Sequence, residues 1–209
     1  MVQGRKGLKI MRKKLFVKFI LLIFILTTTA CSELRFSQLA PETKDFHPQK
    51  VAVFPVEMVS SEGTKSVKGE VEQIIAGSLI EKKWFASVMG TESLNSQLLA
   101  NEELNKAMTE YLSKLQTVNF SDPDLSKKIG ELLKVDAFLM SSVDTWDYTV
   151  EKDKKLAVVG MTMKLYEAST GKLMWKAGYD IKEDYMVIRP ALTKVARDVA
   201  RKMISYMPH

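Results

Sequence analysis

Cysteine is almost absent from this chain, since Cys31 is the only one among 209 residues. A lone cysteine can form no internal disulfide, and it cannot provide the thiolate pairs of a metal cluster. Histidine is nearly as scarce, because the chain holds only His47, in a predicted tether, and His209, the final residue. These absences exclude Ser-His-Asp and Cys-His nucleophiles and histidine-based zinc centres within the predicted domain. We therefore expect no metal and no cofactor.

Acidic residues are missing from positions 1–30, which contain seven cations. Removing these seven from the chain's 31 basic residues leaves 24, against 25 acidic residues, so the remainder is nearly neutral. The net charge of +6 thus comes from the first 30 residues, which are predicted below to be a signal sequence. We predict no nucleic-acid binding on this ground. Phosphate-cradling loops are also missing, since the ten glycines form no Gly-x-Gly-x-x-Gly array.

Long apolar runs are missing as well. Residues 15–26 form an apolar run of about a dozen residues, whereas a membrane-spanning helix needs about 20. Basic residues precede this run, and small residues lie between it and Cys31. A basic start, a short apolar stretch and small residues before a cleavage point are typical of a secretory signal. The sequence therefore predicts a signal peptide over residues 1–30.

The run ends Leu26-Thr-Thr-Thr-Ala-Cys31, which resembles a bacterial lipobox, although Thr28 stands where leucine is usual. The resemblance implies cleavage before Cys31 and acylation of its sulfur, and Ser32 implies sorting to the outer membrane, facing the periplasm. Each buried CH₂ contributes about 0.8 kcal/mol, so several acyl chains give durable anchoring. The alternative is a free thiol at the end of an ordinary signal or anchor helix.

The remainder divides into a predicted tether over residues 31–49, which contains two prolines and no sustained period, and a predicted domain over residues 50–209. Strands are expected at 51–58, 84–89, 135–148, 156–167 and 172–181, and helices at 66–82, twice within 93–115, at 122–133 and from Pro190 onward. These assignments follow the change from helical spacing to strict alternation of apolar residues. They predict a mixed α/β domain built on a single sheet.

Two short motifs fix turns within this pattern. Asp122 directly precedes Pro123, so its carboxylate can cap free amides while proline occupies the first helical position. Gly171 closes the Ser169-Thr170-Gly171 reversal, where a positive φ is expected. The strands on either side of this reversal should therefore form an antiparallel hairpin.

Three segments, residues 51–56 (Val-Ala-Val-Phe-Pro-Val), 130–143 and 166–175, resemble a superfamily of export-linked lipoproteins that includes the curli secretion lipoprotein CsgG and the penicillin-binding-protein activator LpoB. The resemblance implies an α/β fold like that of anticodon-binding domains, with element order β-α-β-α-α-β-β-β-α. It also implies protein contacts in the periplasm.

Four residues near one strand end are candidate partner contacts: Trp146, Tyr148, Asp144 and Asp147. Aromatic side chains with polar tips are common in protein interfaces. The prediction places Trp146 and Tyr148 on the same strand face as Asp144, with Trp146 exposed. Core packing is expected instead for Trp84 and Trp175, and hydrogen bonds to backbone amides for Asp136.

Three functions remain open. The leading hypothesis is a non-catalytic, lipid-anchored module that binds envelope proteins as an assembly or export accessory. The second is a subunit of a homo-oligomeric ring related to secretion. The third is a periplasmic hydrolase that works through the carboxylates of Asp144, Asp147, Glu183 and Asp184; the competing interpretation is that these carboxylates solvate strand ends.

Overall fold

The computed structural model describes residues 31–59 and 65–209. The predicted signal peptide, residues 1–30, lies outside the described residues, as do residues 60–64. One compact unit spans Cys31–His209.

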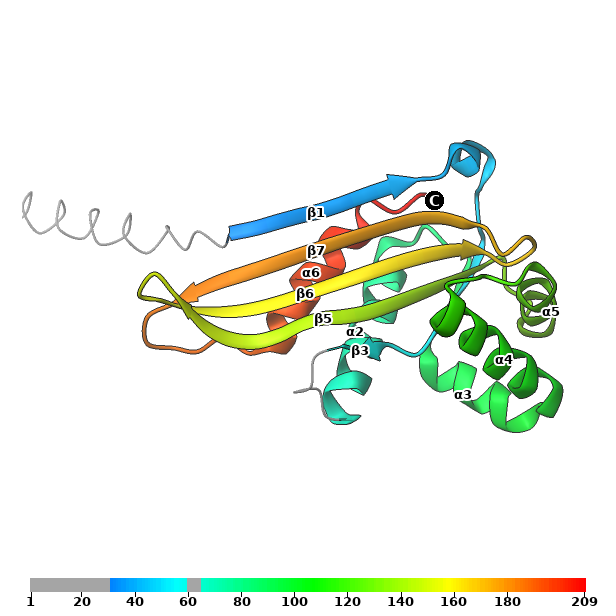
Figure 1. Cartoon of the computed structure of the whole chain (residues 1–209), viewed down its shortest axis with the longest axis horizontal. Helices are drawn as coiled ribbons and strands as arrows, with labels where there is room; N and C mark the ends of the chain where they lie inside the picture. Colours follow the sequence, from blue (N-terminus) through cyan, green and yellow to red (C-terminus); the bar gives the residue numbers. More distant parts are fainter. Residues whose placement is uncertain (1–30, 60–64) are drawn as a thin grey trace, which may run out of the picture. The chain divides into compact units, whose positions relative to one another are not determined.

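This unit contains both strands and helices, with β5, β6 and β7 consecutive in the chain (Figure 1). The strands are β1 (Cys31–Leu39), β2 (Lys50–Val53), β3 (Glu57–Met58), β4 (Ser87–Met89), β5 (Ala137–Glu151), β6 (Lys154–Glu167) and β7 (Leu173–Tyr185). The helices are η1 (Pro41–Asp45), a short 3₁₀ turn, and α2 (Lys65–Lys82), α3 (Thr91–Ala100), α4 (Glu102–Val118), α5 (Pro123–Leu133) and α6 (Leu192–Ile204).

All seven strands belong to one mixed sheet, in the order β1-β7-β6-β5-β2-β4, with β3 paired to β5. The pairs among β1, β7, β6 and β5 are antiparallel, whereas β2 and β3 run parallel to β5. The predicted mixed α/β class with one sheet is confirmed. The observed order departs from the one that the resemblance implied, because it adds β1 and β3 and places three helices, not two, between β4 and β5. These three helices agree with the helical spacing found within 93–115 and at 122–133.

The segment predicted as a tether is part of the sheet. β1 pairs antiparallel with β7 from Cys31, opposite Lys182, to Leu39, opposite Trp175. The hydroxyl of Thr43 then donates to the carbonyl of Met174, which holds η1 against β7. The tether prediction is therefore wrong for residues 31–45, because it rested on local sequence, whereas this pairing joins segments about 140 residues apart.

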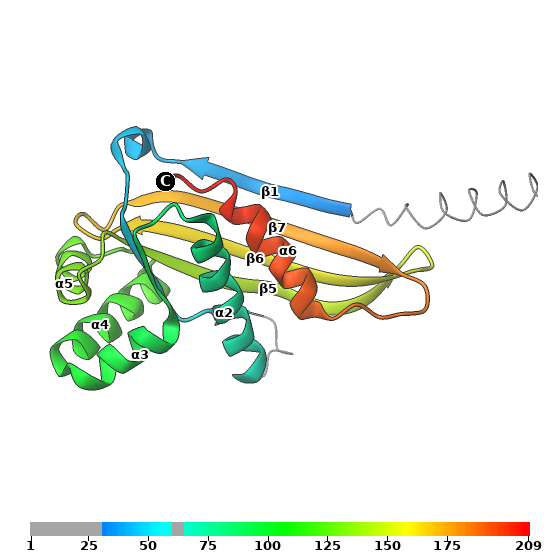
Figure 2. The same cartoon turned by 180° about the vertical axis from the view of Figure 1, so that it is seen from behind.

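Helices α2 and α6 cover one face of the sheet, as Figure 2 shows from behind. Their apolar side chains pack on alternate residues of the strands, with Trp175, Met161 and Val199 fully buried among them. Trp175 was predicted to lie in the core, which is confirmed, while Trp84 is half-buried against the same cluster. The period-2 alternation of β6 and β7 thus directs one apolar row toward these helices.

Helices α3, α4 and α5 cover only part of the opposite face. Leu104, Tyr111 and Ile129 from these helices are buried in one apolar cluster. The cluster also contains Phe54, directly after β2, and Phe138 of β5. The rest of this face, formed by β1, β7, β6 and the second half of β5, lies in front in Figure 1 without a helix over it. We call this uncovered surface the open face.

Local signals in the sequence account for the helix ends and the hairpin. Asp122 accepts from the amides of Asp124 and Leu125, so the predicted cap of α5 is confirmed. Gly171 has φ +68° in the β6–β7 turn, as the reversal required. Asp136 accepts from the amides of Gln49 and Lys50 at 2.8 Å each, which confirms its predicted bonds to backbone.

Among residues 31–59 and 65–209, the structure contains no helix with the length and apolar character needed to cross a membrane.

Candidate functional site

The open face is organised around the guanidinium group of Arg35. Its Nη2 atom lies 2.5 Å from Oδ2 of Asp144 and donates to the carbonyl of Met161 at 2.7 Å. Its Nε atom lies 3.2 Å from Oδ1 of Asp180. One cation from β1 thus joins carboxylates from β5 and β7, across the strand β6 that separates them.

Two β-bulges make this meeting possible. The β1–β7 register shifts between Leu34 and Phe36, at Arg35, and the β5–β6 register shifts between Val143 and Thr145, at Asp144. A bulge inserts one extra residue and re-aims the local side chain. Arg35 and Asp144 are the two inserted residues, so both point onto the open face.

Gly160 provides the space for the carboxylate of Asp180. The two residues are paired across β6 and β7, and a Cβ atom at Gly160 would collide with Oδ1 of Asp180. Hydroxyl groups complete the cluster, since Ser142 and Thr162 donate to Asp144 at 2.8 and 2.7 Å. The acceptors of Asp144 are therefore well satisfied, as expected of a structural carboxylate.

Asp144 and Asp180 compete for this single guanidinium group. Burial raises the pKa of Asp180, the positive charge of Arg35 lowers it, and the nearby carboxylates of Asp144 and Glu33 raise it again. The net effect is a raised pKa, so the proton affinity of Asp180 is higher than usual. The cluster thus contains two carboxyl groups, of Asp144 and Asp180, and one guanidinium group, of Arg35.

An aromatic ring lies beside the charge cluster. The ring of Phe36 covers Gly178, where a Cβ atom would come within 2.7 Å of it, and Nζ of Lys176 lies 4.9 Å from the ring centroid. Gln38 continues the same row of β1, opposite Lys176. The open face thus combines charges of both signs with one partly exposed aromatic ring.

The four predicted contact residues are divided between the two faces. Trp146 is only 6% exposed and lies in the core beneath α2 and α6, so its predicted exposure is wrong. Tyr148 is half-buried against the same core, and its hydroxyl donates to the carbonyl of Pro190 at 2.6 Å. The bulge at Asp144 shifts every later side chain of β5 by one position, which sends Trp146 and Tyr148 to the face opposite Asp144.

The carboxylates considered for hydrolysis are engaged in other contacts. The carboxylate of Asp144 forms an ion pair with Arg35. Oε1 of Glu183 lies 2.9 Å from Nζ of Lys194, and Oδ2 of Asp184 lies 3.3 Å from Nζ of Lys154. Asp147 is exposed, and its Oδ1 accepts from the amide of Tyr148. Each of these carboxylates thus has a partner within the protein.

Arg35 is the functional candidate that sequence reasoning missed. Its segment contains Glu33-Leu-Arg-Phe36, in which charged and apolar residues alternate as in a strand. Two prolines further on favoured a tether instead. The alternation in residues 33–36 was the available signal.

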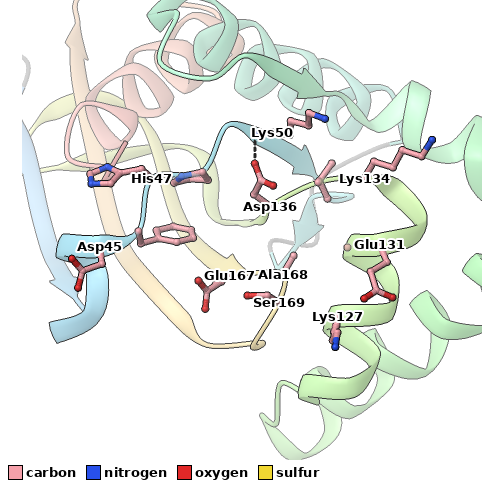
Figure 3. A pocket seen from close by; sticks show the side chains of 14 residues that line it. Asp45, His47, Lys50, Lys127, Glu131, Lys134, Asp136, Glu167, Ala168 and Ser169 are labelled. Carbon is pink, nitrogen blue, oxygen red and sulfur yellow. Dashed lines mark hydrogen bonds between the residues drawn. The ribbon is translucent and has the colours of Figure 1, made fainter.

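A separate cavity of about 580 Å³ lies at the other end of the sheet, where η1, the end of α5 and the β6–β7 turn meet. Figure 3 shows Lys127 and Glu131 of α5, and Lys134 directly after it, across this cavity from Asp45 and Glu167. The lining mixes both charge signs, and Asp136 is occupied by its backbone bonds. Among the described residues, no group of histidine, cysteine and acidic side chains has metal-binding geometry.

Both histidines belong to the folded unit, contrary to the placement of His47 in a tether. Nδ1 of His47 lies 3.2 Å from the carbonyl oxygen of His209, and the ring of His209 stacks on Trp84 at 3.8 Å between centroids. The two residues join the chain end to the segment before β2. They serve packing in this arrangement.

No protein-family model matches the chain, and no curated protein sequence matches it. Among solved structures, the chain is similar to PelC from Paraburkholderia phytofirmans, a dodecamer, with a TM-score of 0.55 and 18% identity over 85% of this chain and 98% of that chain. At this identity the likeness shows a shared fold and no more.

Two further structures are less similar. Lipoprotein GNA1162 from Neisseria meningitidis matches with a TM-score of 0.44 and 13% identity over 77% of this chain and 100% of that chain. The LpoB C-terminal domain from Salmonella enterica matches with a TM-score of 0.33 and 14% identity over 66% and 90%. The structural neighbours thus include a bacterial lipoprotein, but scores this low support no conclusion about this chain.

Proposed function

We propose that this chain is a lipid-anchored envelope protein that acts without catalysis, by contacting other proteins through its open face as an assembly or export accessory. The observation that carries the proposal is the Arg35 cluster, which lies on a four-stranded surface outside the cover of the helices. Arginine and aromatic residues are enriched in protein interfaces, and the open face presents Arg35 next to Phe36.

The anchor in this proposal is acylated Cys31. The compact unit begins at Cys31, the residue that cleavage of the predicted signal would make N-terminal. The backbone of Cys31 is paired with Lys182, so the lipid would be attached to an ordered strand of the domain. Such attachment would hold the domain close to the membrane surface.

A second candidate is a homo-oligomeric subunit, in which the open face contacts copies of the same chain. The likeness to PelC favours it, because that protein is a dodecamer and nearly its whole length is covered. The edge strand β1 adds a row of backbone groups on its outer side, as strands at sheet edges generally do.

The single cysteine allows a sharp test. If Cys31 is acylated, a cysteine introduced by Gln38→Cys supplies the only free thiol, on the open face. A maleimide–diazirine reagent attaches to this thiol and, after illumination of intact envelopes, reacts with any neighbouring group, whether or not that neighbour has a thiol. It should cross-link Gln38→Cys but not Leu99→Cys, a matched control at a 90% exposed position on α3. The unmodified chain serves as a second control, since cross-linking there would reveal a free Cys31 thiol and contradict the anchor.

The product distinguishes the candidates. A ladder at multiples of the chain's own mass supports the homo-oligomer, and a product with one other envelope protein supports the accessory role. If Gln38→Cys and Leu99→Cys react alike, or neither reacts, the open face is not the contact surface.

A further inference from the structure

The loop between β7 and α6 exposes three consecutive apolar side chains. Met186, Val187 and Ile188 are 87%, 91% and 85% exposed. In residues 31–59 and 65–209, no other three consecutive positions are all large, apolar and exposed. Such runs are avoided on water-facing surfaces unless they have a function, because apolar area exposed to water is unfavourable.

This loop lies at the same end of the sheet as the proposed lipid anchor. Cys31 is paired with Lys182, and only three residues of β7 separate Lys182 from Met186. At about 3.3 Å per residue, the loop begins roughly 13 Å beyond the level of Cys31. Figure 1 shows the start of β1 and the β7–α6 connection at the same end of the strands.

The tip of the β5–β6 hairpin lies beside the loop. Val150, which is 68% exposed, is paired with Lys155, and Lys155 is paired in turn with Tyr185. Three strands therefore end at one level, with a further exposed apolar side chain beside the loop.

The charges at this end nearly balance. Lys182 lies 2.7 Å from Glu151, and Lys154 lies 3.3 Å from Asp184, so basic and acidic groups pair across the strands. Attraction to an anionic surface is therefore weak here. An occupant of this end would be held by apolar burial, with the paired charges at the level of polar headgroups.

We propose that the loop of residues 186–188 inserts into the lipid surface, as a second membrane attachment beside the acylated Cys31. This inference rests on the proposed lipid anchor. A loop that docks on a flat protein surface covers side chains on one side only, whereas lipid surrounds all three. Insertion to the boundary of headgroups and acyl chains, about 5–10 Å deep, is within the roughly 13 Å by which the loop extends beyond the level of Cys31.

Two attachments on one end fix an orientation that one lipid alone cannot. The strands would then lead away from the membrane, and the cavity at the β6–β7 turn would face the aqueous side. Residues 154–167 of β6 span roughly 46 Å at 3.3 Å per residue, which places this cavity far from the lipid. The open face would then be roughly perpendicular to the membrane plane and accessible to neighbouring proteins.

Depth-dependent quenching tests the insertion. The full chain, purified from envelopes in mild detergent, is reconstituted into phosphatidylethanolamine and phosphatidylglycerol vesicles that carry bromine on their acyl chains. Ile188→Trp should add emission that shifts to shorter wavelength and loses at least half its intensity to shallow bromines. Leu99→Trp, the matched control on α3, should remain unquenched.

A second measurement separates the loop's contribution to membrane binding from that of the acyl chains on Cys31. In a Cys31→Ser background, replacing Val187 by serine should lower vesicle partitioning roughly tenfold, since one buried apolar side chain contributes about this factor. The anionic lipid fraction should have little effect. Val118→Ser, at a 67% exposed position at the end of α4, is the control and should change nothing.

The failures of the two proposals are distinguishable. Mass spectrometry that finds acyl groups on Cys31, with Ile188→Trp unquenched, overturns insertion and leaves the anchor intact. Quenching of Ile188→Trp without any acyl group supports insertion and overturns the anchor. A wavelength shift without quenching by bromine indicates burial in a protein contact and overturns insertion.

Discussion

The two faces of the strands β5, β6 and β7 differ in the interactions that their side chains make. Beneath α2 and α6, residues such as Trp175, Met161 and Trp146 are closely packed and nearly or fully buried. On the open face the same strands present Asp144, Asp180 and other polar groups that reach one another through Arg35. Hydrophobic burial dominates stability, whereas partly exposed ion pairs contribute little. The covered face therefore stabilises the fold, and the open face is free to vary with function.

The largest effect is expected on the covered face. Trp175→Ala should lower the free energy of unfolding by about 3–5 kcal/mol, because it leaves a cavity beneath α6. Urea unfolding followed by circular dichroism measures it. Leu173→Ala, at a 38% exposed position on the same strand, should change stability by less than about 0.5 kcal/mol. Equal losses for the two variants would contradict the difference between the faces.

A smaller effect is expected at the edge of the sheet, where β1 pairs with β7. Gly178→Ala should cost about 1 kcal/mol, because its Cβ atom forces the ring of Phe36 to move. The amides of residues 36–39 should exchange with deuterium faster as β1 loosens. Combining it with Phe36→Ala should remove most of the cost of the glycine replacement, and an additive double variant would show that the ring is not the obstacle.

Helix α5, which covers part of the face opposite α2 and α6, is capped by the titratable carboxylate of Asp122. A hydrogen bond from Lys114 and the amides of Leu125 and Asp124 lower the pKa of Asp122. Asp122→Ala should cost about 1 kcal/mol at neutral pH. Because the folded pKa lies below the unfolded value of about 3.9, this contribution is complete above that value and is lost as pH falls through the lower folded pKa. Urea unfolding from pH 7 to 2 should show wild type and variant converging only at the acid end.

The smallest change in stability is expected on the open face. Arg35→Gln should cost less than about 1 kcal/mol at neutral pH. It should raise the pKa of Asp180 further, since Arg35 is the main group that lowers it. A carboxyl group that holds its proton more tightly when folded loses stability as pH rises, so the variant should be least impaired in acid. Carbon NMR of the Asp180 carboxyl group measures this.

Lys176→Gln is the control for the open face. It removes a cation from the same surface, near the ring of Phe36, and it should leave the pKa of Asp180 unchanged. An equal rise in both variants would mean that Asp180 responds to the overall charge of the face and not to Arg35.

Local patterns in the sequence predicted much of the fold. Asp122 and Pro123 marked the start of α5, Gly171 marked the hairpin, and alternation identified β6 and β7. Each of these signals acts within a few residues, so no knowledge of the remaining chain was needed.

The candidate site was predicted less well. Asp144 was selected as a contact residue and lies on the open face, but Trp146 was assigned to the wrong side of β5. A single bulge reverses the side of every later residue, and no residue type in 142–146 requires a bulge. Arg35 was missed because its strand exists only through pairing with β7.

The sequence by itself determined the α/β class, the apolar rows of the strands and the scarcity of catalytic side chains, because composition and periodicity are local properties of the chain. Only the tertiary structure decided that residues 31–39 form an edge strand, that Arg35 joins Asp144 to Asp180, and that residues 186–188 lie at the same end as Cys31. These features depend on register between segments far apart in sequence, and register is set by the packing of the whole sheet.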